Sequence, residues 1–328
     1  MSIIFSKNSG LNDDLWKPIG QVLTAVMNDV DNEKGQYDDF VKAVYNEKTS
    51  KKYAEKTAGL TSIGNMVPTK EGDKIALDTI QESEPKLIVH ETFTNGFACT
   101  QEMREDADID VMKAAAQNLV RSYKRTRAQM ASDALTCGAA SYNFGGKTYD
   151  ATTGDGVALF STAHAGSQSN VFTDAFGSDS VVLNKLANVG RNFKNASGHV
   201  QGYTFDTIII PSNCPVLEDT IKKIIRSDRV VGSDYNDINT QKNLWNLVID
   251  PCWQKADGVS KDPFIIMSST ANKELLASMF YDRVPLDVRN WVDEDTRNLN
   301  WSGRARFIPG FRDWRAFIFG GAQSGSTL

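Results

Sequence analysis

The spacing of hydrophobic residues predicts a helical start to the chain. Between residues 15 and 30 they recur every three or four positions, which places them on one face of a helix: Leu15, Ile19, Val22, Leu23, Val26, Met27 and Val30. Asp13 or Asp14 is suited to cap this helix, and Pro18 falls near its first turn, where a missing N–H is tolerated. A second helix is predicted over residues 38–58. Its later half is mostly charged, so this segment needs another surface to lie on.

Alternating hydrophobic and polar residues then predict a β-hairpin. Its first arm runs through Ile75, Leu77 and Thr79, and its second arm runs from residue 87 to residue 93 after a polar break that ends at Pro85. A two-stranded hairpin by itself is only marginally stable in water. Two alternatives are therefore open: the hairpin packs on its own domain, or it reaches across a neighbouring subunit.

A long helix is predicted over residues 110–137, ended by Gly138. At 1.5 Å per residue it would be about 42 Å long, which exceeds most helices of globular domains. Basic residues gather in its middle, namely Arg121, Lys124, Arg125 and Arg127. We expect them to form a solvated face or ion pairs with acidic neighbours, and contact with nucleic acid is the alternative.

The second half of the chain alternates helices and strands. A helix is predicted at 180–193, and strands at 207–210, 247–249 and 264–267. Pro211 ends the first strand, and Ser212 or Asn213 is the expected cap of a helix that starts near Pro215. These elements, with a polar loop at 232–243, predict an α/β unit over residues 180–281.

The tail, residues 284–320, returns to strands and contains three of the six tryptophans. Gly303, Pro309 and Gly310 are expected to form turns between its strands. The whole pattern predicts an α+β fold.

Composition narrows the class of protein. The 328 residues suggest two packed units or one domain with extensions. There are 36 basic and 41 acidic residues, and the resulting net charge of −5 argues against a dedicated phosphate-binding protein. The sequence shows neither a signal-peptide core at its start nor a membrane-spanning run of ~18 apolar residues. Four widely spaced cysteines suggest free thiols in a reducing cytoplasm: Cys99, Cys137, Cys214 and Cys252.

Several motifs invite a chemical interpretation and fail its requirements. Residues 145–148 (GGKT) resemble part of a phosphate loop, but Ser141 stands where that pattern needs glycine. The three histidines, His90, His164 and His199, have no histidine or cysteine at zinc-finger spacing. Structural roles are therefore expected for all three.

The remaining polar candidates have simple structural interpretations. Ser161 is not part of a Gly-x-Ser-x-Gly nucleophile motif. Asp155, between two glycines, is expected to form a turn through bonds from its side chain to local backbone N–H groups. The acidic residues 293–295 are expected to form an exposed loop between strands rather than a cation site. We therefore predict no catalytic, cofactor-binding or metal-binding residue.

Four segments carry a resemblance to a known family. Residues 154–164 (GDGVALFSTAH) resemble the signature that follows the long helix in the Mu-like major head subunit family of tailed-phage capsid proteins. Residues 207–211, 247–251 and 311–315 are similar to later strands of that family. The resemblance covers residues 63–320, and it departs from the family at Ala165, where proline is common.

The resemblance implies the Hong Kong ninety-seven type capsid fold. In that fold residues 1–62 would form an N-terminal arm and residues 63–100 an extended β-hairpin loop that reaches a neighbouring subunit. Residues 101–179 and 282–328 would form a peripheral domain around the long helix. Residues 180–281 would form the axial domain, with the loop at 232–243 near the centre of a capsomer.

The implied function is that of a major capsid protein. Hexamers and pentamers would form an icosahedral shell around double-stranded phage DNA, which the shell would contact without sequence specificity. Assembly in the bacterial cytoplasm would place the protein in the virion, away from any membrane. Implied partners are a separate scaffolding protein and a portal protein, with a decoration protein as an optional third. Crosslinking through Lys70, Lys74 or Lys86 is conceivable, but non-covalent assembly is favoured.

Two other functions stay open at this point. An encapsulin-like bacterial nanocompartment shell would have the same fold and enclose an enzyme instead of a genome. A cytoplasmic α/β hydrolase would use His164 in catalysis.

Overall fold

The structure is a computed structural model, which describes residues 4–5, 17–33, 35–57, 66, 68–75, 77, 86–106, 108–177, 180–195, 198–230 and 238–322. The chain forms two compact units, which are described separately. The first consists of Met1–Glu55, Val89–Ala131 and Phe280–Pro309. The second consists of Lys56–Ile88, Ser132–Met279 and Gly310–Leu328.

A long mixed sheet forms the frame of the first unit. Its central strands β11 (Ser278–Val292) and β12 (Leu299–Phe311) are followed by β5 (Glu91–Cys99), which pairs with β12 so that Cys99 lies opposite Leu299. Two short strands, β1 (Ile4–Phe5) and β2 (Asn46–Thr49), pair with β11. Alternate residues are buried over residues 299–306 of β12, as expected for a strand with one covered face, and residues 307–311 are all buried.

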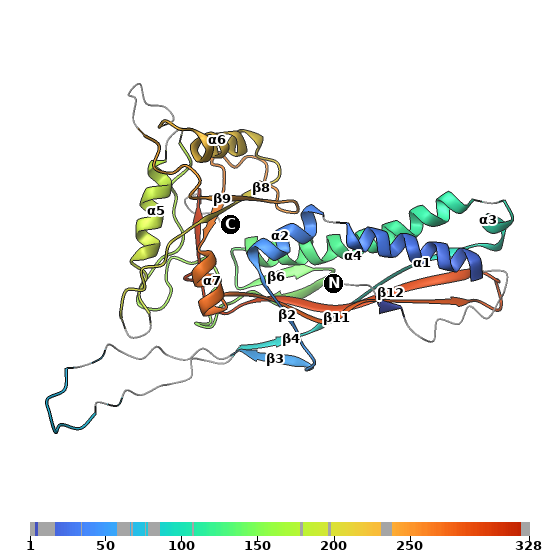
Figure 1. The fold of residues 1–328 in the computed structure, drawn as a ribbon, viewed down its shortest axis with the longest axis horizontal. Coiled ribbons are helices and arrows are strands. Elements are labelled where there is room, and N and C mark those ends of the chain that lie inside the picture. The colour runs from blue at the N-terminus through green and yellow to red at the C-terminus, as the bar shows by residue number, and fades with distance from the viewer. Residues whose placement is uncertain are drawn as a thin grey trace. The chain divides into compact units, whose positions relative to one another are not determined.

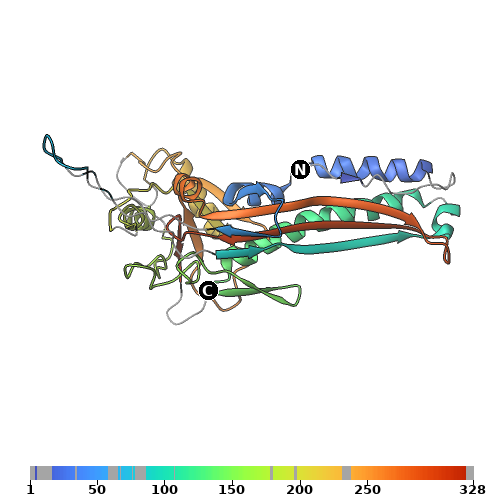
Figure 2. The same cartoon turned by 90° about the horizontal axis from the view of Figure 1, so that it is seen from below.

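Helices α1 (Lys17–Asn32) and α4 (Ile109–Thr136) contribute to the core on this sheet (Figures 1 and 2). The smaller α2 (Gln36–Val44) and α3 (Gln101–Glu105) complete the helices of this unit. The core joins residues from both long helices and three strands: Leu23, Met27, Val30, Cys99, Met112, Ala116, Leu119, Val120, Leu286, Val288, Leu299 and Trp301. The predictions of α1 and α4 from their apolar stripes are therefore confirmed, while the caps Asp13 and Asp14 lie outside the described residues.

Two local predictions for this region of the chain are wrong. The helix expected over residues 38–58 ends at Val44, because the charged residues after it have no apolar face to bury. They form β2 and β3 (Ala54–Thr57) instead, and these strands satisfy their backbone groups by pairing.

Gly303, Pro309 and Gly310 are not turns, since all three lie inside β12. A Cβ on Gly303 would lie 2.9 Å from Leu286 Cδ1, so this glycine allows close packing within the strand.

A smaller sheet with three fully buried strands organises the second unit. Its order is β13 (Phe317–Gly320), β10 (Phe264–Met267), β8 (Thr207–Pro211) and β9 (Asn246–Asp250), and only β8 and β9 are parallel. Every residue of β8, β10 and β13 is buried, which explains their continuous hydrophobic sequences. The strands predicted at 207–210, 247–249 and 264–267 are confirmed.

Three helices accompany this sheet: α5 (Val181–Arg191), α6 (Pro215–Arg226) and α7 (Ser269–Leu275). The cap prediction for α6 is wrong. Its N-cap is Cys214, which makes no side-chain cap bond. Ser212 Oγ and Asn213 Nδ2 instead donate to the carbonyls of Trp253 and Lys255. The predicted loop at 232–243 lies partly outside the described residues, and residues 240–243 form turns.

The second arm of the predicted hairpin is confirmed as β4 (Lys86–Val89) and the start of β5, and β4 pairs with β3. Ile75 and Leu77 belong to no strand. Thr79 and residues 81–85 lie outside the described residues.

Candidate functional site

The signature segment is centred on a pair, the buried His164 and the partly buried Asp155. His164 Nδ1 donates to Asp155 Oδ2 at 2.8 Å, and its Nε2 lies 3.2 Å from Asn170 Oδ1. The imidazole stacks on the Trp314 indole with ring centroids 4.2 Å apart. Its side chain has no exposed surface, so both faces and both nitrogens are enclosed. This arrangement fixes the ring rather than presenting it to a substrate.

Asp155 joins the turn to this histidine. Its Oδ1 accepts bonds from the Thr153 hydroxyl and the Val157 N–H, as the turn interpretation predicted. Burial raises the pKa of Asp155, but the hydrogen bonds from His164, Thr153 and Val157 outweigh burial and lower the pKa to about 2. The carboxylate therefore stays ionised and stabilises the folded segment.

We expect Asp155→Asn to destabilise the protein by about 1.5–3 kcal/mol at pH 7, because it removes a charged hydrogen-bond acceptor. The folded pKa lies below the unfolded value of about 3.9. The stabilisation is therefore present above pH 4 and is lost as the pH falls through 2. Chemical unfolding of both proteins between pH 2 and pH 7 measures this, and the gap between them should narrow below pH 4. A gap that stays constant would contradict the assigned role.

Asn170 is the functional residue that sequence reasoning missed at this site. It is fully buried, and its Nδ2 donates to the carbonyls of Leu159 and Phe317. Its Oδ1 also accepts the Ser161 N–H at 2.9 Å. An isolated asparagine in a polar stretch gives no sequence signal for such a role.

The same geometry argues against a hydrolase. Ser161 Oγ accepts the Ala163 N–H, and no bond between this hydroxyl and His164 is found in the described part of the chain. A nucleophile needs a base within hydrogen-bond reach. The other histidines also have structural surroundings: His90 Nε2 lies 3.1 Å from Ser50 Oγ, and burial lowers the pKa of His90. The His199 N–H donates to Asn195 Oδ1.

The remaining sequence candidates are turns. Gly145 and Gly146, both with positive φ, connect β6 (Ser141–Phe144) to β7 (Lys147–Asp150) in a tight hairpin, so this segment is not a phosphate loop. Residues 293–298 connect β11 to β12, with Glu294 and Asp295 exposed. None of the four cysteines, all of which lie in the described part of the chain, forms a disulfide. In the part of the chain that the structure describes, no group of histidine, cysteine or acidic residues is arranged to hold a metal ion.

A buried charge cluster lies on α4 in the first unit. Arg127 Nη2 lies 2.9 Å from both Glu47 Oε1 and Asp282 Oδ2, and Nη1 lies 3.7 Å from Asp38 Oδ1. Its side chain is 4% exposed, and its guanidinium lies 4.8 Å from the Phe280 ring centroid. These contacts confirm the prediction of ion pairs for this residue.

Lys124 has a related role about one helical turn before Arg127. Its ammonium pairs with Asp38 at 3.0 Å. It also donates to the carbonyls of Val30, Asp31 and Glu33, which end and follow α1. A cation near the C-terminus of a helix satisfies carbonyls that have no partner within that helix. Lys124 therefore fastens α1 to α4.

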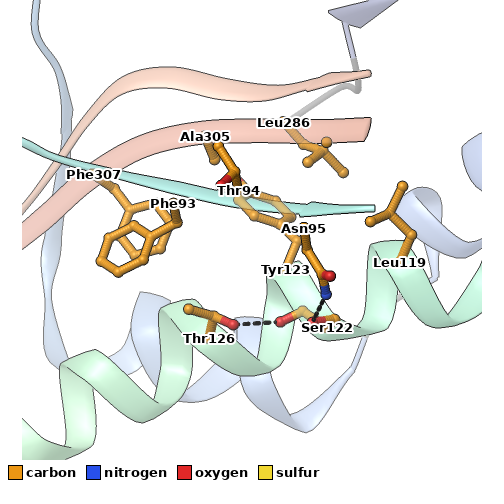
Figure 3. A pocket seen from close by; sticks show the side chains of 11 residues that line it. Phe93, Thr94, Asn95, Leu119, Ser122, Tyr123, Thr126, Leu286, Ala305 and Phe307 are labelled. Atoms are coloured by element: carbon orange, nitrogen blue, oxygen red, sulfur yellow. Dashed lines mark hydrogen bonds between the residues drawn. The ribbon is translucent and has the colours of Figure 1, made fainter. Parts of the chain in front are cut away.

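A small apolar pocket lies where β5 and β12 face α4 (Figure 3). Its volume is about 130 Å³, and Phe93, Leu119, Leu286 and Phe307 line it. Asn95 Nδ2 donates to Ser122 Oγ at its edge. Binding sites for small molecules are typically 300–1,000 Å³, so this pocket is too small to be a substrate site.

Large hydrophobic side chains are exposed in the segment between β3 and β4. Met66, Ile75 and Leu77 are 101%, 82% and 92% exposed. Tyr53, just before β3, is 69% exposed, and Leu87, within β4, is 62% exposed. Single exposed hydrophobic residues are common, but such a group indicates an interaction surface. Among the described residues, no helix meets the length and hydrophobicity needed to cross a membrane.

Comparison with known families identifies the chain. A family model described as "Phage capsid protein" matches residues 83–318, which is more than half of the sequence. The chain belongs to the phage capsid protein family. The matched region includes the signature segment, both long strands and α4.

Solved structures show the same fold in phage-related capsids. One is the capsid of a native GTA particle, with 11% sequence identity and a TM-score of 0.56 over 88% of this chain and 90% of that chain. Another is Mycobacterium phage Patience, with 13% identity and a TM-score of 0.52 over 100% of this chain and 95% of that chain. These likenesses establish the Hong Kong ninety-seven type fold of this phage capsid protein. No curated protein sequence matches the chain.

The family match decides between the alternatives from the sequence. The protein is a phage major capsid protein, a structural component of the virion. A nanocompartment shell would have the same fold, but the matching family is that of phage capsids.

Proposed function

We propose that this capsid protein assembles as hexamers and pentamers into a closed icosahedral shell around double-stranded DNA. The observation that supports assembly most directly is the segment with Met66, Ile75 and Leu77 exposed, because these side chains have no burial within their own subunit. Each hydrophobic side chain that becomes buried contributes about 1.5–3 kcal/mol. Neighbouring copies supply that burial in the shell.

The segments of the chain take the roles that the capsid fold offers. Residues 63–100 form the extended loop that reaches a neighbour, and residues 1–62 form the N-terminal arm. Residues 101–179 and 282–328 form the peripheral domain, and residues 180–281 form the axial domain. The observed compact units group the chain differently at several boundaries, since residues 132–179 belong to the second unit. The proposed division describes roles in the shell, whereas the compact units describe packing within one chain.

The protein performs this role without catalysis. His164 is enclosed by Asp155, Asn170 and Trp314, and the apolar pocket in the first unit is smaller than a substrate site.

DNA is confined through non-specific contacts, which the net charge of −5 keeps weak. Assembly takes place in the host cytoplasm, with a separate scaffolding protein and a portal protein as partners and a decoration protein as an optional third.

Assembly is non-covalent in this proposal. Lys86 is the most buried of the three lysines considered for crosslinking, and its ammonium contacts the Thr152 carbonyl and Asp150. It is therefore held away from a neighbouring subunit. Denaturing gels of purified particles should show the capsid protein only at 36.2 kDa. A ladder of multiples would contradict non-covalent assembly.

Electron microscopy of the purified protein tests the function. We expect closed icosahedral particles when the protein is expressed with its scaffolding partner, and irregular or wrongly sized shells when it is expressed alone. Mass spectrometry of particles isolated from lysed host cells should find DNA-packaging partners. Particles that carry a cargo enzyme instead would support a nanocompartment. A protein that stays monomeric at every concentration, with and without scaffold, would contradict the proposal.

A further inference from the structure

The middle of α4 is strongly basic in a chain that is acidic as a whole. Residues 111–132 contain no aspartate or glutamate. Their basic residues are Lys113, Arg121, Lys124, Arg125 and Arg127. Three of them are neutralised within the subunit: Lys113 by Asp110, Lys124 by Asp38, and Arg127 by its three carboxylates. Arg121 and Arg125 are exposed, and neither forms an ion pair with any residue that the structure describes.

These two arginines line a groove of about 580 Å³ between α4 and the connection from α1 to α2. They are one helical turn apart, so their Cα atoms are separated by about 6 Å along the axis. Amide and hydroxyl donors from Gln36, Asn118 and Tyr37 complete the polar lining. Among the residues that line the groove, Glu33 is the one carboxylate. The groove therefore suits an anionic protein segment with several hydrogen-bond acceptors.

The same unit carries a dense acidic surface at one end. The β11–β12 turn and the segment that leads into α4 lie at this end, because Leu299 pairs with Cys99 immediately before α3 (Figures 1 and 2). Its acidic residues are Glu102, Glu105, Asp106, Asp108, Asp110, Asp293, Glu294 and Asp295. Basic residues within these stretches and beside them are Arg104, Lys113 and Arg297. We call this surface the acidic end.

We propose that the groove at Arg121 and Arg125 binds the acidic end of a second copy of this chain. The inference rests on the proposed shell function and names one of its contacts. The two surfaces have opposite charge and both are exposed. Because the groove and the acidic end are different surfaces, the contact between two copies is heterologous. In a closed ring of copies, every groove and every acidic end would have a partner. Two acidic ends placed next to each other would repel. In a crowded shell the acidic end therefore needs a cationic partner.

A second copy fits the groove better than DNA does. The groove is concave and includes the hydrophobic residues Val30 and Tyr37 as well as Glu33. A phosphate backbone would be repelled by Glu33 and would gain little from an apolar floor. A protein segment with the exposed Ile109 and Val111 beside its carboxylates matches both the charge and the apolar lining.

The test is a charge reversal with a charge-swap rescue, measured by light scattering and electron microscopy at several salt concentrations. Arg121→Glu with Arg125→Glu reverses the groove, and Glu294→Lys with Asp295→Lys reverses the turn of the acidic end. Each double variant should assemble at least tenfold more slowly than the wild type at about 0.1 M salt, where surface charges are only partly screened. The chain with all four substitutions should recover most of the rate. Lys48→Glu with Lys51→Glu is the matched control, because these lysines are exposed in the same unit and outside the groove.

The outcomes separate this inference from the shell function. If the wild type forms shells and both charge-reversed variants assemble normally, the inference is wrong but the shell function stands. The same holds if the chain with all four substitutions folds well but does not recover the assembly rate. Normal assembly with loss of DNA retention in the arginine variant would assign the groove to DNA instead. If the reversed variant misfolds, Arg121→Gln with Arg125→Gln replaces it, and a loss of salt dependence in its assembly rate supports the contact. A wild-type protein that forms no shell would contradict the proposed function itself.

Discussion

Replacing Arg127 with alanine will lower the free energy of unfolding by about 3–5 kcal/mol, because buried carboxylates lose their counter-charge. Asp282 is the most deeply buried partner, with a side chain 6% exposed. Glu47 and Asp38 also point at the guanidinium. Chemical unfolding followed by tryptophan fluorescence measures the loss. We expect Arg127→Lys to recover only a fraction of it, since a single ammonium does not match the fork geometry of the guanidinium.

Arg125→Ala is the matched control for this prediction. Arg125 lies on the same helix but is exposed, so its removal should change the stability by no more than about 0.5 kcal/mol. If Arg127→Ala yields too little soluble protein, the double variant with Asp282→Asn should partially restore folding, because it removes one uncompensated charge. A loss below about 1 kcal/mol for Arg127→Ala would show that the cluster is not important for the stability of the fold.

Placing aspartate at both Ile75 and Leu77 will prevent shell assembly at the concentrations where the wild type assembles, while leaving the single subunit as stable as before. Both side chains are almost fully exposed, so the isolated chain loses no burial. In a shell their burial would contribute about 3–6 kcal/mol per copy, and two buried carboxylates would add a further penalty. We expect the concentration needed for assembly to rise at least a hundredfold, as measured by sedimentation and electron microscopy.

Val216→Asp provides the comparison for the loop variant. Val216 is 75% exposed on α6, so the substitution adds the same kind of charge to an exposed hydrophobic position elsewhere. It should leave assembly within about threefold of the wild type if the loop is the specific contact, since surface substitutions usually have small effects. Normal shells from the Ile75 and Leu77 variant would remove the main support for the proposed role of residues 63–100.

The elements that the sequence predicted well have a strong and regular hydrophobic pattern. The stripe of Met112, Ala116 and Leu119 predicts α4 to within one residue at each end, and it is the same stripe that enters the core. The apolar runs in β8 and β10 predict these two strands equally well. In these segments the local pattern and the tertiary packing require the same structure.

The predictions that failed depend on partners distant in the sequence. Residues 46–57 have no apolar face, so their strands exist only because β11 and β4 offer backbone groups to pair with. Gly303 looks like a turn residue, but it is needed inside β12 to admit Leu286. The site shows the same limit: the turn at Asp155 was predictable, whereas its bond to His164 and the support from Asn170 depend on a fold that brings them together.

The attachment of α1 by Lys124 has a consequence for how the subunit changes shape. One ammonium holds three carbonyls around the end of α1, and the side chains of α1 enter the core. If the shell expands or matures, α1 should therefore travel with α4 as a single rigid lever.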